Sequence, residues 1–249
     1  LQGGGLYLTS SAELTRCDIS ENSATFGAGA YLTGAAPRFT SSRFLNNSAT
    51  QGGGGLFILA SSPVLTQSLI TGNDADFGAG IAVTSPEQAR SAPYLLNSIL
   101  AYNRNYNLYE DTPVSVLEYC DLYNPPDWEN HTLWTLGSTN VTVEPRFLAY
   151  TSERVPSNLH LAIDSPLIDM GTATWNDLDG SRSDPGTFGG PQGGLWDRDQ
   201  DGVPDYFWPG TLQQAPDGFD PAAYDCDDTD ATVQRCDGGV RGRTDGDRW

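Results

Sequence analysis

The stretch FTSSRFLNN, residues 39–47, has three counterparts in this 249-residue chain: LTRCDISEN at 14–22, LTQSLITGN at 65–73 and LLNSILAYN at 95–103. Each begins with a large apolar residue, has a small residue three positions later, then a second large apolar residue, and ends in asparagine. The copies start 25, 26 and 30 residues apart. A period of this size indicates a solenoid whose coils stack into one continuous core.

The spacing of apolar residues within each copy indicates strands. Apolar positions recur at i and i+2 and form no face with a 3.6-residue period. A leucine-rich repeat would need its own leucine pattern and a helical segment, and the sequence has neither. Prolines recur where a strand should open, at Pro37, Pro63 and Pro93. Glycines recur where the chain must turn, in the pairs Gly27 with Gly29, Gly52 with Gly54, and Gly78 with Gly80.

These features predict an all-β chain that folds as a right-handed parallel β-helix. Equal positions of successive coils would lie about 4.8 Å apart. We therefore expect a structural ladder of amide hydrogen bonds along Asn22, Asn47, Asn73 and Asn103. A fifth coil is expected at 117–122, where Leu117, Cys120 and Leu122 repeat the spacing of the first copy. Strand-like runs at 141–147 and 159–163 extend this to about seven coils and roughly 30 Å.

Two groups of motifs resemble bacterial β-helix families. The glycine-rich steps and FLNNSA at 44–49 resemble the repeats of chlamydial-type polymorphic outer-membrane proteins. VEPRF at 143–147, NLHL at 158–161, DSPLIDMG at 164–171 and the Asp-x-Asp-Gly-x-Arg segment at 177–182 resemble the C-terminal coils of secreted choice-of-anchor proteins. The resemblance covers most of residues 1–190 and implies a β-helix with an extracellular or cell-surface location in a bacterium.

Composition restricts the partners of the chain. It carries 32 acidic residues against 13 basic ones, all of them arginine, for a formal net charge of −19. This balance disfavours nucleic acid and anionic membranes and favours cations. No apolar run reaches the length of about 18 residues that a membrane span needs. The acid is concentrated near the C-terminus, with 18 acidic residues and 6 arginines from residue 164 onward.

The four cysteines fall into two kinds. Cys17 and Cys120 hold the same repeat position four coils apart, about 19 Å at strand spacing, so we expect buried thiols rather than a disulfide. Cys226 and Cys236 lie ten residues apart in a Gly- and Asp-rich tail. A disulfide there would suit a small segment without an obvious core and would indicate an oxidising compartment.

The tail contains a candidate calcium loop, WDRDQDGVPD at 196–205. Alternate carboxylates around a glycine turn are what Ca²⁺ requires, and a backbone carbonyl can add a ligand. The first ligand set is Asp197, Asp199, Asp201, the carbonyl of Val203, and Asp205. Trp208 stands where an EF-hand loop would have its bidentate glutamate, so a helix-loop-helix sensor is not expected.

A second acidic cluster can complete the coordination. It consists of Asp225, Asp227, Asp228 and Asp230. The arrangement resembles Asp- and Cys-rich metal-binding repeats of secreted bacterial proteins and, more distantly, the type-three calcium repeats of thrombospondins. We expect one to three Ca²⁺ ions that order the tail, against the alternative of solvated acidic turns. Asp177, Asp179 and Asp184 suit turn formation as well as ligation.

An enzyme of the polysaccharide lyase or hydrolase type is the alternative function, because some parallel β-helices use surface carboxylates, Ca²⁺ and a basic residue. The candidate residues are Asp74, Asp76, Arg90, Arg104, His131 and His160. They form no recognisable constellation in sequence. The histidines are expected in a loop and on a strand surface.

The preferred interpretation is a calcium-stabilised structural or adhesive protein without catalytic residues. It divides into a β-helix at 1–172, a connecting or capping segment at 173–195 and a metal-binding module at 196–249. The first residues already fit a coil, so the edge of the first coil should be covered by a missing segment, another domain or the next subunit. Head-to-tail stacking would give a homo-oligomer or a fibre, and a surface polysaccharide is the other candidate partner.

Overall fold

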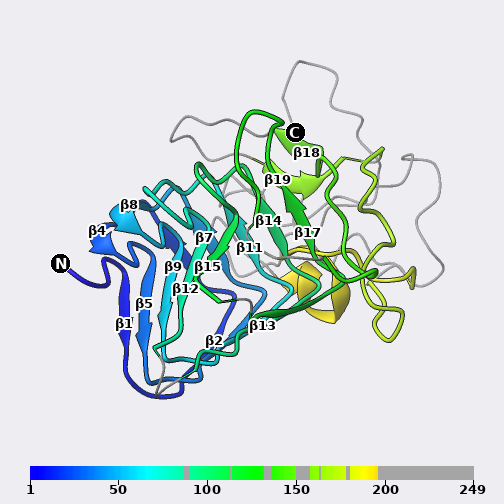
Figure 1. Ribbon diagram of the computed structural model, residues 1–249. Helices are drawn as coiled ribbons and strands as arrows, with labels where there is room; N and C mark the ends of the chain where they lie inside the picture. Colours follow the sequence, from blue (N-terminus) through cyan, green and yellow to red (C-terminus); the bar gives the residue numbers. More distant parts are fainter. Residues whose placement is uncertain are drawn as a thin grey trace, which may run out of the picture.

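The computed structural model describes residues 1–86, 90–112, 114–131, 136–149, 158–162, 164–177 and 180–195. Within these ranges the chain forms a parallel β-solenoid of about five coils (Figure 1). The described helical structure is a single 3-10 segment, η1 (Gly190–Leu195). The predicted all-β solenoid is therefore confirmed.

Three parallel five-stranded sheets run along the stack, and each coil contributes one strand to each. Sheet 1 contains β1 (Leu6–Leu8), β5 (Ala30–Thr33), β9 (Leu56–Leu59), β12 (Ile81–Thr84) and β15 (Leu108–Glu110). Sheet 2 contains β2 (Glu13–Thr15), β6 (Arg38–Thr40), β10 (Val64–Thr66), β13 (Tyr94–Leu96) and β16 (Val116–Glu118). Sheet 3 contains β3 (Asp18–Ser20), β7 (Arg43–Leu45), β11 (Leu69–Thr71), β14 (Ile99–Ala101) and β17 (Asp121–Tyr123). A shorter pair, β4 (Ser23–Phe26) and β8 (Ser48–Gly52), joins sheets 3 and 1.

The sequence repeat maps directly onto the sheets. Its first apolar residue lies on sheet 2, where Phe39 pairs with Leu65, and its second lies on sheet 3, where Phe44 pairs with Ile70. All four side chains are fully buried in the central core. Pro37, Pro63 and Pro93 directly precede β6, β10 and β13 as predicted, and their carbonyls accept backbone N–H groups from the following coil.

The asparagine ladder is present and structural. The Oδ1 atoms of Asn47, Asn73 and Asn103 each accept both the backbone N–H and the side-chain amide of the asparagine one coil earlier, at 2.8–3.0 Å. Asn124 continues the ladder by accepting the backbone N–H of Asn103. Because these amides are buried, their mutual hydrogen bonds satisfy polar groups that water cannot reach.

The glycine turns differ from the prediction by one position in the second coil. The left-handed backbone conformation falls on Gly27, Gly53 and Gly78, so Gly53 rather than Gly52 is the turn residue. The register of β4 with β8 shifts between Ala24 and Phe26, which inserts one extra residue in β8. Gly52 has another role: a Cβ there would collide with the ring of Phe77 from the next coil.

The prediction of about seven coils was wrong, because regular coiling ends after β17. Val141 makes a single parallel bridge to Asp121 and covers that strand. The two later strand-like runs form a hairpin instead of coils: β18 (Phe147–Ala149) pairs antiparallel with β19 (Asn158–Leu161). This hairpin lies over the last strands of sheet 3 (Figure 1).

The described residues from 141 to 188 form a cover over the outer face of sheet 3. Leu69 and Ile99 point outward from that sheet, yet they are only 1% and 2% exposed. They form a second apolar core with side chains of the cover, namely Val141, Val143, Phe147, Leu159, Leu161, Leu167, Ile168 and Phe188. The chain therefore folds back onto the solenoid because coils three and four present an apolar outer face.

The chain then follows the corner between sheets 2 and 3 from the fifth coil back to the first. Arg182 stacks over Tyr119 of coil five at 5.7 Å, and Asn97 of coil four bonds to Thr172, Ser183 and Gly186. Gln67 of coil three donates to the carbonyls of Asp184 and Gly186. Arg16 of coil one donates to Gln192 at 3.0 Å. We call residues 171–192 the strap.

Candidate functional site

Two of the candidate catalytic residues, Asp74 and Arg104, occupy equivalent positions in adjacent coils. Each directly follows a ladder asparagine, and a parallel bridge joins their backbones. The Arg104 Nη1 and Asp74 Oδ2 atoms are 4.0 Å apart, with the side chains 64% and 50% exposed. The guanidinium also lies over the ring of Trp128 at 5.9 Å. An ion pair this exposed is weak, so it leaves Arg104 available to other partners.

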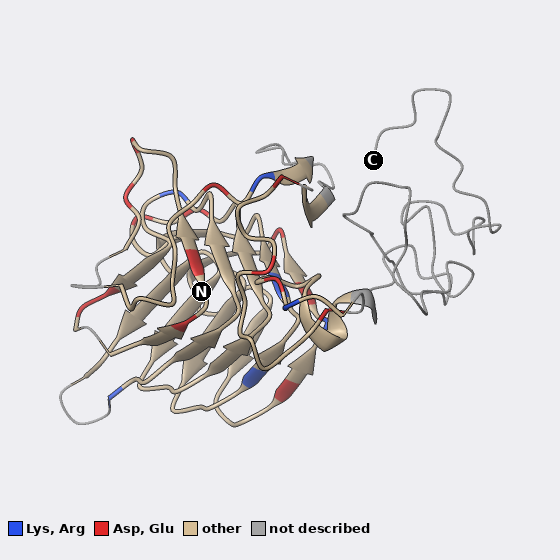
Figure 2. Ribbon diagram, turned by 90° about the vertical axis from the view of Figure 1, so that its right-hand side faces the viewer, with Lys and Arg blue, Asp and Glu red and all other residues tan. Residues whose placement is uncertain are grey.

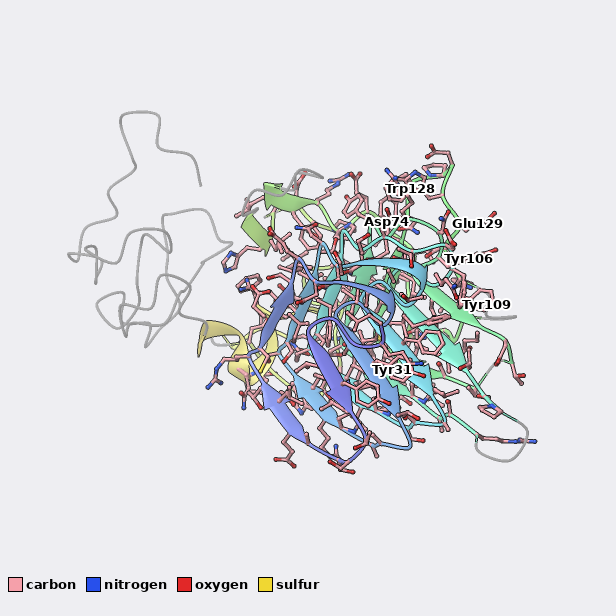
Figure 3. All side chains as sticks on the ribbon, turned by 90° about the vertical axis from the view of Figure 1, so that its left-hand side faces the viewer. Tyr31, Asp74, Tyr106, Tyr109, Trp128 and Glu129 are labelled. Atoms are coloured by element: carbon pink, nitrogen blue, oxygen red, sulfur yellow. The ribbon has the colours of Figure 1, made fainter. Side chains whose placement is uncertain are left out.

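Aromatic side chains continue from this corner along sheet 1. Tyr7, Tyr31 and Phe57 stack on one another across three coils, with ring centroids 5.3 Å apart. Phe77 joins Phe57 to Tyr109, which in turn contacts Tyr106. Figure 3 shows Tyr106, Tyr109, Trp128 and Asp74 on one side of the molecule, with Tyr31 further along the same side. We call Tyr7, Tyr31, Phe57, Phe77 and Tyr109 the aromatic row.

The remaining candidate catalytic residues lie apart. Asp76 and Arg90 are exposed in loops. His131 forms a parallel bridge with Leu108 at the end of sheet 1, which fits the expected loop position after the fifth coil. His160 was expected on a strand surface, but it is buried in the cover and stacks on Phe188 at 3.7 Å. The structure thus pairs Asp74 with Arg104 and places the histidines in packing positions.

One buried acid was missed at the sequence level. Asp121 is fully buried on the outer face of sheet 3, where it occupies the position of Ile99 in the preceding coil. Its Oδ1 accepts the backbone N–H of Val143 from the cover at 3.0 Å. Burial raises the pKa of this carboxyl to about 8, although the hydrogen bond from Val143 opposes the shift. The available signal was the pair of apolar outward positions, Leu69 and Ile99, which indicates that sheet 3 is covered.

The two cysteines of the coils are free thiols, as predicted. Cys120 is buried, whereas Cys17 in the first coil is partly exposed. Each Sγ lies near the carbonyl two residues earlier, which places both thiols at the core end of the same turn. The predicted Cys226–Cys236 disulfide lies outside the described residues.

The acidic groups of the strap make turns. The Asp177 carboxylate accepts the backbone N–H groups of Asp184 and Gly190, and Asp184 Oδ1 accepts the N–H of Asp169 at 2.6 Å. These contacts support the turn-forming interpretation of Asp177 and Asp184. Across the described ranges, no three His, Cys, Asp or Glu side chains converge as metal ligands. Both predicted calcium ligand sets, from Asp197 to Asp230, lie outside those ranges.

Charged residues do not gather on one side of the described chain. Figure 2 shows them spread over turns and strand ends, with most of the coil surface uncharged. No helix in the described ranges has the length and hydropathy needed to cross a membrane. No protein-family model, curated protein sequence or solved structure matches this chain. The functional argument therefore depends on the geometry.

Proposed function

We propose that this chain is an extracellular structural or adhesive β-helix of a bacterium, which binds surfaces or copies of itself and is stabilised by calcium at its C-terminal side. The supporting observation is the aromatic row together with Arg104 and Trp128 on one side of the solenoid. Tyrosine, tryptophan and arginine are the residues that carry most binding energy at protein interfaces. A rigid coil stack holds them in place, so little conformational entropy is lost on binding.

The exposure along this side supports contact with a partner. Tyr7 at the first coil is 50% exposed, while Tyr31 and Phe57 beside it are 4% and 6% exposed. The buried rings form a firm base, and the outer tyrosines and Arg104 offer stacking and hydrogen-bonding groups to a partner. A surface polysaccharide and a second copy of the chain both match this chemistry.

Adhesion is tested by replacing exposed members of the surface. Tyr106→Ala with Arg104→Ala should reduce binding of the full chain to immobilised cell-wall polysaccharide and to immobilised wild-type chain. Glu13→Ala, an exposed residue on sheet 2, is the matched control. Equal binding of the variant and the wild type to both surfaces would count against this side as the adhesive one.

The calcium part of the proposal rests on the carboxylate spacing at 197–205 and 225–230. Titration of the chelator-treated full chain with CaCl₂ should saturate at one to three ions. The paired substitution Asp201→Asn and Asp227→Asn should abolish at least one of them, whereas Asp76→Asn on the coils should not. Absence of binding heat in the wild type would remove calcium from the proposal.

Assembly is a separate part of the proposal. Sedimentation of the full chain in millimolar calcium should show oligomers that chelation dissociates. A single monomeric species in calcium would contradict self-association while leaving adhesion to a polysaccharide in place.

A polysaccharide lyase or hydrolase is the second candidate, and the pairing of Asp74 with Arg104 favours it. An arginine beside a carboxylate could hold an acidic sugar next to a general base. Turnover of an acidic polysaccharide that is lost in both Asp74→Asn and Arg104→Ala would establish this alternative. Unchanged turnover in both variants would exclude this corner as the active site.

A further inference from the structure

The outer face of sheet 3 contains one acid among apolar side chains. Asp121 and Tyr123 of β17 point outward, while Leu122 between them is part of the central core. In the two preceding coils the position of Asp121 is occupied by Ile99 and Leu69. The carboxyl therefore lies where the sheet otherwise provides apolar packing for the cover.

The carboxyl has little polar company. Its Oδ1 accepts the N–H of Val143, and its Oδ2 is buried without a hydrogen-bond partner in the described chain. The Val141 bridge places the first residues of the cover directly against it. A carboxylate with one backbone donor and no cation is costly to ionise in such a site, whereas a neutral carboxyl is not.

The other titratable groups nearby do not supply a positive charge. Glu118 and Cys120 lie on the solenoid side, with Tyr123 beside Asp121 and Tyr102 on the neighbouring coil. From the cover, Glu144 faces Tyr102, and its charge and that of Asp121 both act on Tyr123. Arg146 of the cover is paired with Asp164 at 2.9 Å, and His160 stacks on Phe188. Negative neighbours thus reinforce the effect of burial.

We propose that Asp121 makes the cover a pH-sensitive closure, which packs against sheet 3 with a neutral carboxyl and loosens when the carboxyl ionises. Opening the cover exposes Asp121 to water, where a carboxyl ionises near pH 4. Closing it raises the pKa to about 8. Closure therefore takes up a proton at intermediate pH. The closed state is fully favoured below about pH 4 and loses up to about tenfold in its equilibrium constant per pH unit until about pH 8, above which the dependence ends.

Hydrogen exchange of the full-length chain tests this closure. The measured amides are those of β17 and residues 141–148, and Asp121→Asn keeps the size and polarity of the side chain while removing the charge. Comparing wild type with variant at the same pH cancels the intrinsic pH dependence of exchange. The wild-type rate relative to the variant should rise several-fold per pH unit between pH 5 and 8. A ratio that stays constant across this range would overturn the proposal.

Two further measurements keep the test decisive. Glu144→Gln should retain the wild-type pH dependence, and its loss would assign the effect to Glu144 instead. The carboxyl carbon resonance of Asp121 in the wild-type chain should titrate above pH 7, which does not depend on the folding of any variant. A midpoint below pH 5 would contradict the proposal.

Discussion

The side-chain amide of Asn47 donates to Oδ1 of Asn73, 3.0 Å away in the next coil, and the same oxygen accepts the backbone N–H of Asn47 at 2.9 Å. Asn47 also donates to the carbonyl of Ile19. One buried amide thus connects three successive coils. Removing it leaves several buried polar groups without partners, which is more damaging than the loss of the hydrogen bonds alone.

Asn47→Ala should destabilise the chain by about 2–4 kcal/mol, because buried donors and acceptors of coils one and three lose their partner. The free energy of unfolding from urea denaturation checks this. Asn22→Ala is the matched control, since Asn22 is partly exposed in the first coil and should cost less than about 1 kcal/mol. Equal losses in the two variants would contradict a ladder whose importance lies in its buried members.

Gly52 and Phe77 should be strongly coupled. Gly52→Ala places a methyl group against the Phe77 ring and should destabilise by about 1–3 kcal/mol, the range for overpacking a buried site. In a Phe77→Leu background the same change should cost clearly less, because the ring is gone. A double-mutant cycle by urea denaturation measures the difference. Strictly additive effects would show that the cost of Gly52→Ala arises from the backbone and not from the ring.

Asn97 should anchor the strap. Asn97→Ala removes the acceptor of the Thr172 N–H and the donor to Ser183 Oγ, both at 2.8 Å. Limited proteolysis within residues 171–192 should become several-fold faster, while cleavage elsewhere in the coils stays at the wild-type rate. The control is Arg16→Ala, which removes a single exposed contact at the other end of the strap. Uniform acceleration across the whole chain would indicate global destabilisation instead.

The two thiols of the coils should differ in reactivity. Burial raises the pKa of Cys120 to about 12, so almost no thiolate forms at pH 8, whereas Cys17 is partly exposed. In a chain that carries Cys226→Ser and Cys236→Ser, a thiol reagent should modify one cysteine under native conditions and two in urea. Peptide mapping should identify the native site as Cys17. Rapid native labelling of Cys120 would contradict its burial.

The regular part of the fold could be predicted because each coil repeats the same physical requirements. Phe39 and Phe44 recur as apolar residues at fixed positions, and the asparagine three residues later gives the register. The turn at Gly53 could not be assigned, since the run at 52–55 contains four glycines and a bulge decides which one adopts the left-handed conformation. The end of the coiling was also missed, because the alternation in β18 and β19 predicts strands but not the direction in which they pair.

The candidate site was predictable to a similar degree. Asp74 and Arg104 each follow a ladder asparagine, so their proximity follows from the repeat. Trp128 lies beyond the last regular coil, where the repeat gives no register, and its contact with Arg104 could not be anticipated. Asp121 was missed because the cover that buries it comes from residues 141–188, and only the tertiary structure shows that this segment returns to sheet 3.

The route of the strap changes how the coils depend on one another. In a stack where each repeat contacts only its neighbours, terminal coils can fray independently and unfolding can begin at either end. Here a single segment is tied to coils one, three, four and five, so that losing an end coil also releases contacts at distant ones. The strap thereby adds long-range cooperativity to an architecture that otherwise resembles a one-dimensional chain of independent units.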